Sequence, residues 1–170
     1  MSHLVACLYV RRASPYKLLP MCDCWDEQRN AFNYVGSLPV IAHPPCATWG
    51  RCKNWAKQDT AGCGLHAVDI VRRLGGVVEQ PADSTLWKAT GARDGDLWGG
   101  RMYRIRQWDW GHRAIKPTDL YAVGLQELPP YPVRHLVDPI PVLKMWRGER
   151  ERTPPALAAF LVTWVMGGAK

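Results

Sequence analysis

A short apolar segment, Val40-Ile41-Ala42, runs directly into His43, two prolines and Cys46. Proline fixes its own φ, donates no backbone hydrogen bond and disfavours the helical region for the residue before it. We therefore expect a buried strand over residues 38–42, followed by a stiff turn that places the Cys46 thiol at the edge of a sheet. The alternative is a buried structural cysteine beside an ordinary loop, because free cysteine is among the most buried residue types.

The rest of the chain alternates between strand and helix patterns. Strands are expected at residues 3–10, 76–81, 103–110 and 119–123, helices at 65–74 and 156–165, and a short helix capped by Asp26 at 25–32. The strand, helix and strand of residues 38–81 imply a right-handed crossover and parallel strands, which brings Cys46 and Glu79 to the same carboxyl edge. The last two strands are expected to form a C-terminal antiparallel hairpin. The prediction is one α/β domain over residues 1–170, with a reduced Rossmann-like, mostly parallel sheet and flanking helices.

The charge of the chain favours a polyanionic partner. Lys and Arg total 22 against 15 Asp and Glu, which gives a formal net charge of +7. Most of the nine tryptophans lie within a few residues of Arg or Lys. Indole rings beside cations suit stacking on bases, although packing in the core is the alternative. Nucleic acid or a nucleotide is therefore the predicted ligand.

The chain is predicted to be a cytoplasmic protein that does not enter a membrane. It shows no apolar run long enough to span a bilayer and no secretory leader. The six cysteines are irregularly spaced, so we expect free thiols in a reducing cytosol. Cys52, Cys63 and His66 lack a clear fourth zinc ligand, and no metal is expected.

A thiol and a carboxylic acid at neighbouring strand ends have a specific chemical use. Attack of a thiolate on carbon 6 of a pyrimidine is easier when an acid gives a proton to the ring nitrogen, and carbon 5 then becomes nucleophilic. Cys46 and Glu79 would supply this pair. The alternative for Glu79 is a solvated carboxylate at a strand end.

These residues resemble the DNA cytosine carbon-5 methyltransferases. In that family the nucleophile lies in a Pro-Pro-Cys loop, matched by Cys46, and the acid lies in a Glu-Asn-Val or Glu-Asn-Pro segment, matched by Glu79. Arg104 and Arg106, with Gln107, resemble its Gln-x-Arg-x-Arg strand in a different order. The chain resembles more closely the small methyltransferase-like proteins encoded by bacteriophages. The matching segments are residues 41–46, 79–81, 86–87, 110–121 and 151–155, and the likeness covers roughly residues 38 to 166.

The resemblance implies a methyltransferase-like core, a phage gene and two classes of function. The first is an enzyme that modifies a pyrimidine in DNA or in a nucleotide, with Cys46 as nucleophile and Glu79 as proton donor. Its substrate-binding residues would be His43, Pro45, Arg104, Arg106, His112, Lys116 and Thr118, of which Arg104, Arg106 and Lys116 would hold phosphate. The second is a binding module without cofactor that holds nucleic acid, a nucleotide or a host defence protein as a counter-defence factor.

The implied cofactor and partners follow from the same resemblance. S-adenosylmethionine is the candidate cofactor, but no glycine occurs between the first strand and Gly36, where such folds usually carry a glycine-rich turn. A chain this short has little room for a separate domain that reads duplex sequence. A homodimer or a host protein partner is therefore expected to complete recognition, in the cytoplasm of the host cell.

Overall fold

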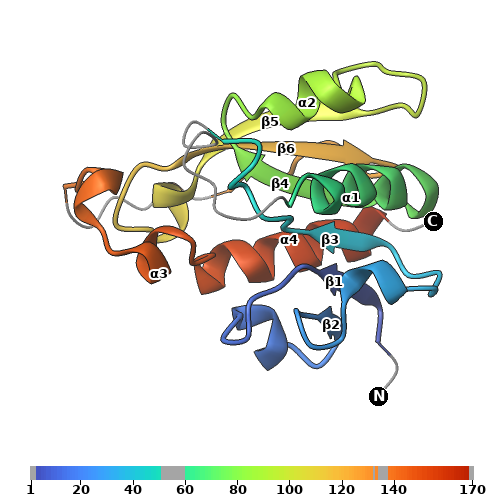
Figure 1. The fold of residues 1–170 in the computed structure, drawn as a ribbon, viewed down its shortest axis with the longest axis horizontal. Helices are drawn as coiled ribbons and strands as arrows, with labels where there is room; N and C mark the ends of the chain where they lie inside the picture. Colours follow the sequence, from blue (N-terminus) through green and yellow to red (C-terminus); the bar gives the residue numbers. More distant parts are fainter. Residues whose placement is uncertain (1–2, 51–59, 132, 134–137, 169–170) are drawn as a thin grey trace.

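The protein, seen in a computed structural model that describes residues 3–50, 60–131, 133 and 138–168, is built on a six-stranded sheet of order β2-β1-β3-β4-β6-β5 (Figure 1). The strands are β1 (Val5–Leu8), β2 (Cys22–Trp25), β3 (Val40–Ala42), β4 (Gly76–Pro81), β5 (Arg101–Arg106) and β6 (Pro117–Val123). β1 pairs in parallel with β2 and β3, and β3 pairs in parallel with β4. β6 is antiparallel to both β4 and β5, so the fold is α/β with a mixed sheet.

Helices cover both faces of this sheet (Figure 1). The helices are α1 (Ala61–Leu74), α2 (Thr85–Thr90), α3 (Arg147–Arg150) and α4 (Pro155–Gly168), with 3-10 turns η1 (Pro15–Leu18), η2 (Ala31–Asn33), η4 (Gln107–Trp110) and η5 (Val142–Lys144). Successive strand residues point to opposite faces. Ile41 and Val77 therefore join the core under α4, whereas Ala42 and Val78 join the core under α1.

Several sequence expectations are confirmed with shifted ends. The strand at residues 76–81 is β4, and α1 begins at Ala61, four residues before the predicted start at 65. The predicted hairpin is the β5/β6 pair, but its first strand ends at Arg106 because residues 107–110 form the 3-10 turn η4. The described cysteines, Cys7, Cys22, Cys24, Cys46 and Cys63, are free thiols as predicted.

The helix predicted at residues 25–32 is wrong. Trp25 is the last residue of β2, where it pairs with Leu8. The Asp26 side chain does accept hydrogen bonds from the backbone amides of Gln28 and Arg29, at 3.0 and 3.2 Å, but it caps a turn and no helix follows. Edge pairing with β1 takes the residues that the apolar pattern assigned to a helix. The helices of the described residues, α4 included, fall short of the length and apolarity that a membrane span needs.

Candidate active site

The strand order reverses between β1 and β3, since β2 lies on one side of β1 and the later strands lie on the other. In open α/β sheets, ligands bind in the crevice outside the carboxyl ends of the strands at such a reversal. His43 follows the last residue of β3 and Glu79 lies near the end of the parallel neighbour β4. The sequence prediction that Cys46 and Glu79 share one edge of the sheet agrees with this topology.

Four side chains from different elements form a hydrogen-bonded chain at this edge. The Tyr16 hydroxyl lies 2.8 Å from His43 Nε2, and His43 Nδ1 lies 3.0 Å from Glu79 Oε2. Gln107 Nε2 donates to Glu79 Oε1 at 2.8 Å. Tyr16 and Gln107 are fully buried, and the side chains of His43 and Glu79 are only 11% and 12% exposed. The Glu79 carboxylate is therefore held by both of its oxygens.

The pKa directions fix where the protons of this chain lie. Burial alone raises the pKa of Glu79, but the hydrogen bonds from His43 and Gln107 and the charge of Lys116 outweigh it and hold the pKa below its ordinary value. Burial raises the pKa of Tyr16 well above its ordinary value. Tyr16 therefore keeps its proton and donates it to His43 Nε2, and His43 Nδ1–H donates to the Glu79 carboxylate.

Cys46 is half-buried, in the turn between β3 and α1. The turn is fixed by backbone partners: Gln80 Nε2 donates to the Pro44 carbonyl at 2.6 Å, and the Gly50 amide donates to the Cys46 carbonyl at 2.7 Å. Burial raises the pKa of the Cys46 thiol, and the negative charge of Glu79 raises it further, whereas Lys116 lowers it. At neutral pH the thiol is protonated and lies in the electrostatic field of both side chains.

Lys116 precedes β6 and has a backbone φ of +42°, which non-glycine residues rarely adopt. Its carbonyl accepts hydrogen bonds from the Gln107 amide at 3.2 Å and from the Thr118 hydroxyl at 3.1 Å, and these contacts hold the turn. Burial lowers the pKa of the ammonium, while Glu79 and Cys46 act to raise it. Among the described residues no hydrogen bond or ion pair holds this ammonium. Strained backbone of this kind concentrates at functional sites.

The structure therefore brings together five of the nine predicted site residues. Cys46, Glu79, His43, Lys116 and Thr118 belong to one cluster, in which Gln107 Nε2 also contacts the Thr118 hydroxyl at 3.1 Å. Pro45 is exposed in the turn before Cys46. The His112 side chain is buried and accepts a hydrogen bond from the Ala114 amide at 3.0 Å. Burial lowers the pKa of His112, and its contact orders the connection between β5 and β6.

The two arginines lie apart from this cluster. Glu79 pairs across the sheet with Leu120 and through it with Tyr103, whereas Arg104 pairs with Asp119, so Arg104 points to the opposite face. Arg104 donates to Asp119 and Asp83, both at 2.8 Å, and Arg106 donates to Asp109 at 3.2 Å.

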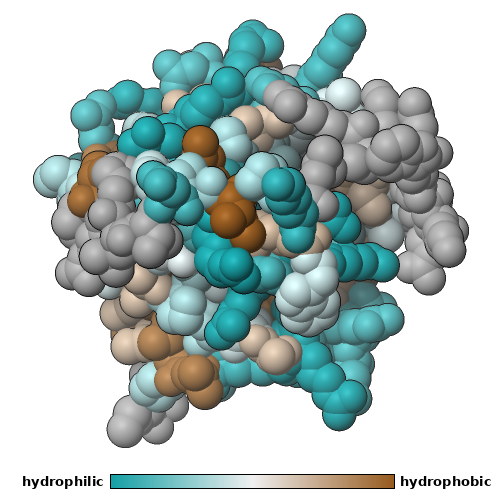
Figure 2. Space-filling view, turned by 90° about the vertical axis from the view of Figure 1, so that its left-hand side faces the viewer, coloured by the Kyte–Doolittle hydropathy of each residue, from teal (hydrophilic) through white to brown (hydrophobic). Residues whose placement is uncertain are grey.

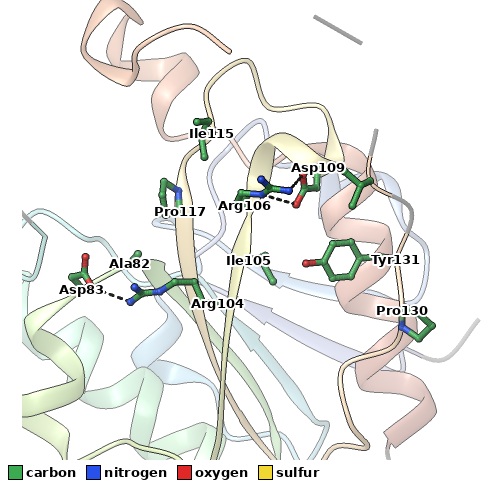
Figure 3. A pocket seen from close by; sticks show the side chains of 11 residues that line it. Ala82, Asp83, Arg104, Ile105, Arg106, Asp109, Ile115, Pro117, Pro130 and Tyr131 are labelled. Atoms are coloured by element: carbon green, nitrogen blue, oxygen red, sulfur yellow. Dashed lines mark hydrogen bonds and ion pairs between the residues drawn. The ribbon is translucent and has the colours of Figure 1, made fainter. Parts of the chain in front are cut away.

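Both arginines line a groove of about 780 Å³ along the edge strand β5 (Figure 3). Ile115 and Pro117 lie at one side of this groove and Tyr131 at the other (Figure 3). Each guanidinium is already engaged by carboxylates, which compete with any phosphate for it.

The segment after β1 does not fit S-adenosylmethionine or a dinucleotide. Such cofactors approach a glycine-rich turn closely, whereas here Tyr9 follows β1 directly with a φ of +58°. The Tyr9 hydroxyl lies 2.6 Å from His66 Nδ1, and the Phe32 ring packs on His66 with centroids 4.8 Å apart. Aromatic side chains fill the position where a backbone approach would be needed, so we derive no step through this cofactor.

For a metal ion, the described residues contain no cluster of three or more His, Cys, Asp or Glu suited to hold one. Cys52, one of the zinc ligands considered from the sequence, lies outside the described residues. The structure therefore offers no metal-dependent step to derive.

Two residues of the site were missed from the sequence. Tyr16 lies in the 3-10 turn η1 and Gln107 at the start of η4, and neither belongs to a pattern that marks function. Gln107 had been noted only as a neighbour of the two arginines. The available signal was weak: a glutamine at the end of a strand beside two arginines, with its amide 0% exposed only after folding.

A test of the buried network is the acid dependence of stability. The folded-state pKa of Glu79 lies below its ordinary value of 4.5, so ionised Glu79 stabilises the protein above that pH and the contribution is lost as pH falls through the folded-state pKa. Wild type is therefore expected to lose more free energy of unfolding than Glu79→Gln between pH 7 and about pH 3. Urea unfolding at each pH measures this, and parallel curves for the two proteins would contradict it.

The cluster combines a protonated thiol, an ionised carboxylate and an unpaired ammonium at one edge of the sheet. This set can move one proton between sulfur and oxygen beside a fixed positive charge. Comparisons of the chain with models of protein families, with curated proteins and with solved structures return no match. Any activity must therefore be inferred from these side chains themselves.

Proposed function

We propose that the protein is a pyrimidine-modifying enzyme in which the Cys46 thiolate adds to carbon 6 of the ring and Glu79 carries the proton that the ring nitrogen receives. One observation carries the proposal: the Cys46 thiol and the Glu79 carboxylate, delivered by adjoining parallel strands, lie in one another's electrostatic field. Lys116 lies in the field of both. Buried, mutually perturbed groups of this kind are the usual mark of acid–base and nucleophilic chemistry.

The three charges favour a single shared proton. Two anions, the thiolate and the carboxylate, repel one another in a poorly solvated site, and this repulsion raises the pKa of Cys46. With one proton between them, either Glu79 is ionised and Cys46 is a thiol, or Glu79 is protonated and Cys46 is a thiolate. Lys116 balances the remaining negative charge in both forms. The second form is the reactive one.

The reaction steps balance without an external acid. The thiol proton of Cys46 passes to the Glu79 carboxylate, the sulfur forms a bond to carbon 6, and Glu79 delivers the same proton to the ring nitrogen. The pair of electrons from the former double bond then makes carbon 5 nucleophilic. His43 and Gln107, which hold the two oxygens of Glu79, orient the carboxylate during this transfer. Reversal expels the sulfur and restores the ring.

The topology supports the proposal at a coarser level. The order β2-β1-β3-β4, with its reversal between β1 and β3, is that of a reduced Rossmann-like sheet, and the candidate cluster occupies the carboxyl edge where such sheets bind ligands. The resemblance of the Pro-Pro-Cys and Glu-Gln-Pro segments to cytosine carbon-5 methyltransferases assigns the same two residues. Both lines of support concern the site and leave the electrophile that would react at carbon 5 open.

Hydrogen exchange at carbon 5 tests the proposal without any cofactor. In deuterium oxide, the adduct takes a deuteron at carbon 5, loses the original hydrogen and releases a deuterated pyrimidine, a change that NMR detects by loss of the ring H5 signal. The protein is expected to catalyse this exchange on cytosine in deoxycytidine monophosphate and in a single-stranded oligonucleotide, and Cys46→Ala is expected to abolish it. Cys63→Ala is the matched control, because Cys63 is also a half-buried free thiol and lies on α1. Exchange that persists in Cys46→Ala, or is absent from wild type, contradicts the proposal.

A further inference from the structure

Trp146 stands apart among the tryptophans because its side chain faces solvent. It is 74% exposed, whereas Trp110 and Trp164 are buried in the core under α4. It immediately precedes α3, and its indole lies against Gly148: a Cβ at residue 148 would lie 2.1 to 2.2 Å from the six-membered ring. The glycine therefore lets the ring lie on the helix backbone with its other face open. An exposed flat indole fixed in this way is a stacking surface.

The surroundings of Trp146 are cationic. Residues 144–152 contain four cations, Lys144, Arg147, Arg150 and Arg152, against the two carboxylates of Glu149 and Glu151. Both carboxylates also pair with arginines from elsewhere in the chain, Arg113 with Glu149 and Arg11 with Glu151. The face that carries this segment is largely hydrophilic (Figure 2). Its charge is complementary to a phosphate backbone.

α3 adjoins the candidate active site. It lies at the same end of the molecule as the carboxyl end of β3 (Figure 1). Glu151, which closes α3, lies in the electrostatic field of both Cys46 and Lys116, and Cys46 in turn acts on Arg147, the residue beside Trp146. A ligand long enough to extend from the Cys46 hollow therefore meets the Trp146 ring next.

We propose that Trp146 is a base-stacking platform for single-stranded nucleic acid, positioned to hold the nucleotide adjacent to the one presented to Cys46. A free nucleotide has one base, which the Cys46 hollow takes, so the platform is used only by a chain of at least two nucleotides. In a duplex, both faces of each base are already stacked and none is free for the indole. The cations of residues 144–152 hold the phosphates between the two bases.

The proposal deepens the proposed function, since it names the substrate class of the same site. It is tested separately by binding. The dissociation constant of a fluorescein-labelled single-stranded dC oligonucleotide, measured by anisotropy, is expected to rise about 10- to 100-fold in Trp146→Ala, as loss of one stacked base predicts. Trp98→Ala is the matched control: Trp98 is 48% exposed and also lies beside a cation, with Arg72 3.7 Å above its ring, but it lies in the loop after α2. Its dissociation constant is expected to stay within twofold of wild type.

Three further arms give each result a meaning. Carbon-5 exchange on deoxycytidine monophosphate is expected to be unchanged in Trp146→Ala, because a mononucleotide does not reach the platform. An RNA oligonucleotide of the same length distinguishes a DNA from an RNA ligand, and a hairpin duplex is expected to bind less tightly than either. Equal binding by wild type and Trp146→Ala, no binding by wild type, or tighter binding of the duplex overturns the proposal. A change of sedimentation coefficient in Trp146→Ala without loss of binding also overturns it and identifies an interface between copies of the chain. Binding without exchange would contradict the proposed function and leave the platform standing.

Discussion

Replacing Glu79 with glutamine is expected to lower the rate of carbon-5 exchange by about 10³-fold, within the range that general acid–base groups contribute. The amide cannot take the thiol proton from Cys46, so both the thiolate and the protonated acid are lost together. The fold is expected to survive, because His43 can change its tautomer. Its Nδ1 then accepts a hydrogen bond from the new amide, and its Nε2–H donates to the Tyr16 hydroxyl, at the two contacts of 3.0 and 2.8 Å that it already makes.

The control for this variant is Glu127→Gln. Glu127 is an exposed carboxylate that pairs with Arg101 at 3.0 Å, and its substitution is expected to change neither the exchange rate nor the stability measurably. Exchange by Glu79→Gln at the wild-type rate would show that another group transfers the proton. Lys116 would then be the group to examine, since it lies in the field of the same thiol.

Replacing Gly76 with alanine is expected to lower the free energy of unfolding by about 4 kcal/mol or more, which is exceptional for one methyl group. Gly76 begins β4 with a φ of +123°, and a Cβ there would lie 1.9 Å from the Val40 carbonyl oxygen and 2.6 Å from the Val40 nitrogen. The clash is with backbone of β3, so a side-chain rotation cannot relieve it. Alanine would separate the two parallel strands that carry Cys46 and Glu79.

Gly91→Ala separates the clash from the conformational strain. Gly91 also has a positive φ, +66°, but an added Cβ there meets no atom within 4 Å. Its substitution is expected to cost only about 1 kcal/mol, the strain of a left-handed residue. Urea unfolding midpoints of the two variants measure the difference. Equal losses would mean that the approach of β3 to Gly76 is not what requires the glycine.

The sequence by itself determined the strands that deliver the thiol and the acid. Val40-Ile41-Ala42 ends at two prolines, which fix the turn to Cys46, and residues 76–81 carry Glu79 at the end of an apolar run. A helix between two such strands requires a crossover that makes them parallel, and parallel strands end at one edge. These signals are local along the chain, or follow from the handedness of one connection, so folding added little to them.

Only the tertiary structure decided which side chains surround that pair. Tyr16 and Gln107 reach His43 and Glu79 across 27 and 28 residues of sequence, and their hydrogen bonds exist only once the sheet edge is buried. The placement of Arg104 depended on register in the same way. One residue of shift between β5 and β6 would move it to the face of Glu79, because side chains alternate across a sheet. Register and long-range burial are properties of the packed sheet, and no local pattern in the sequence encodes them.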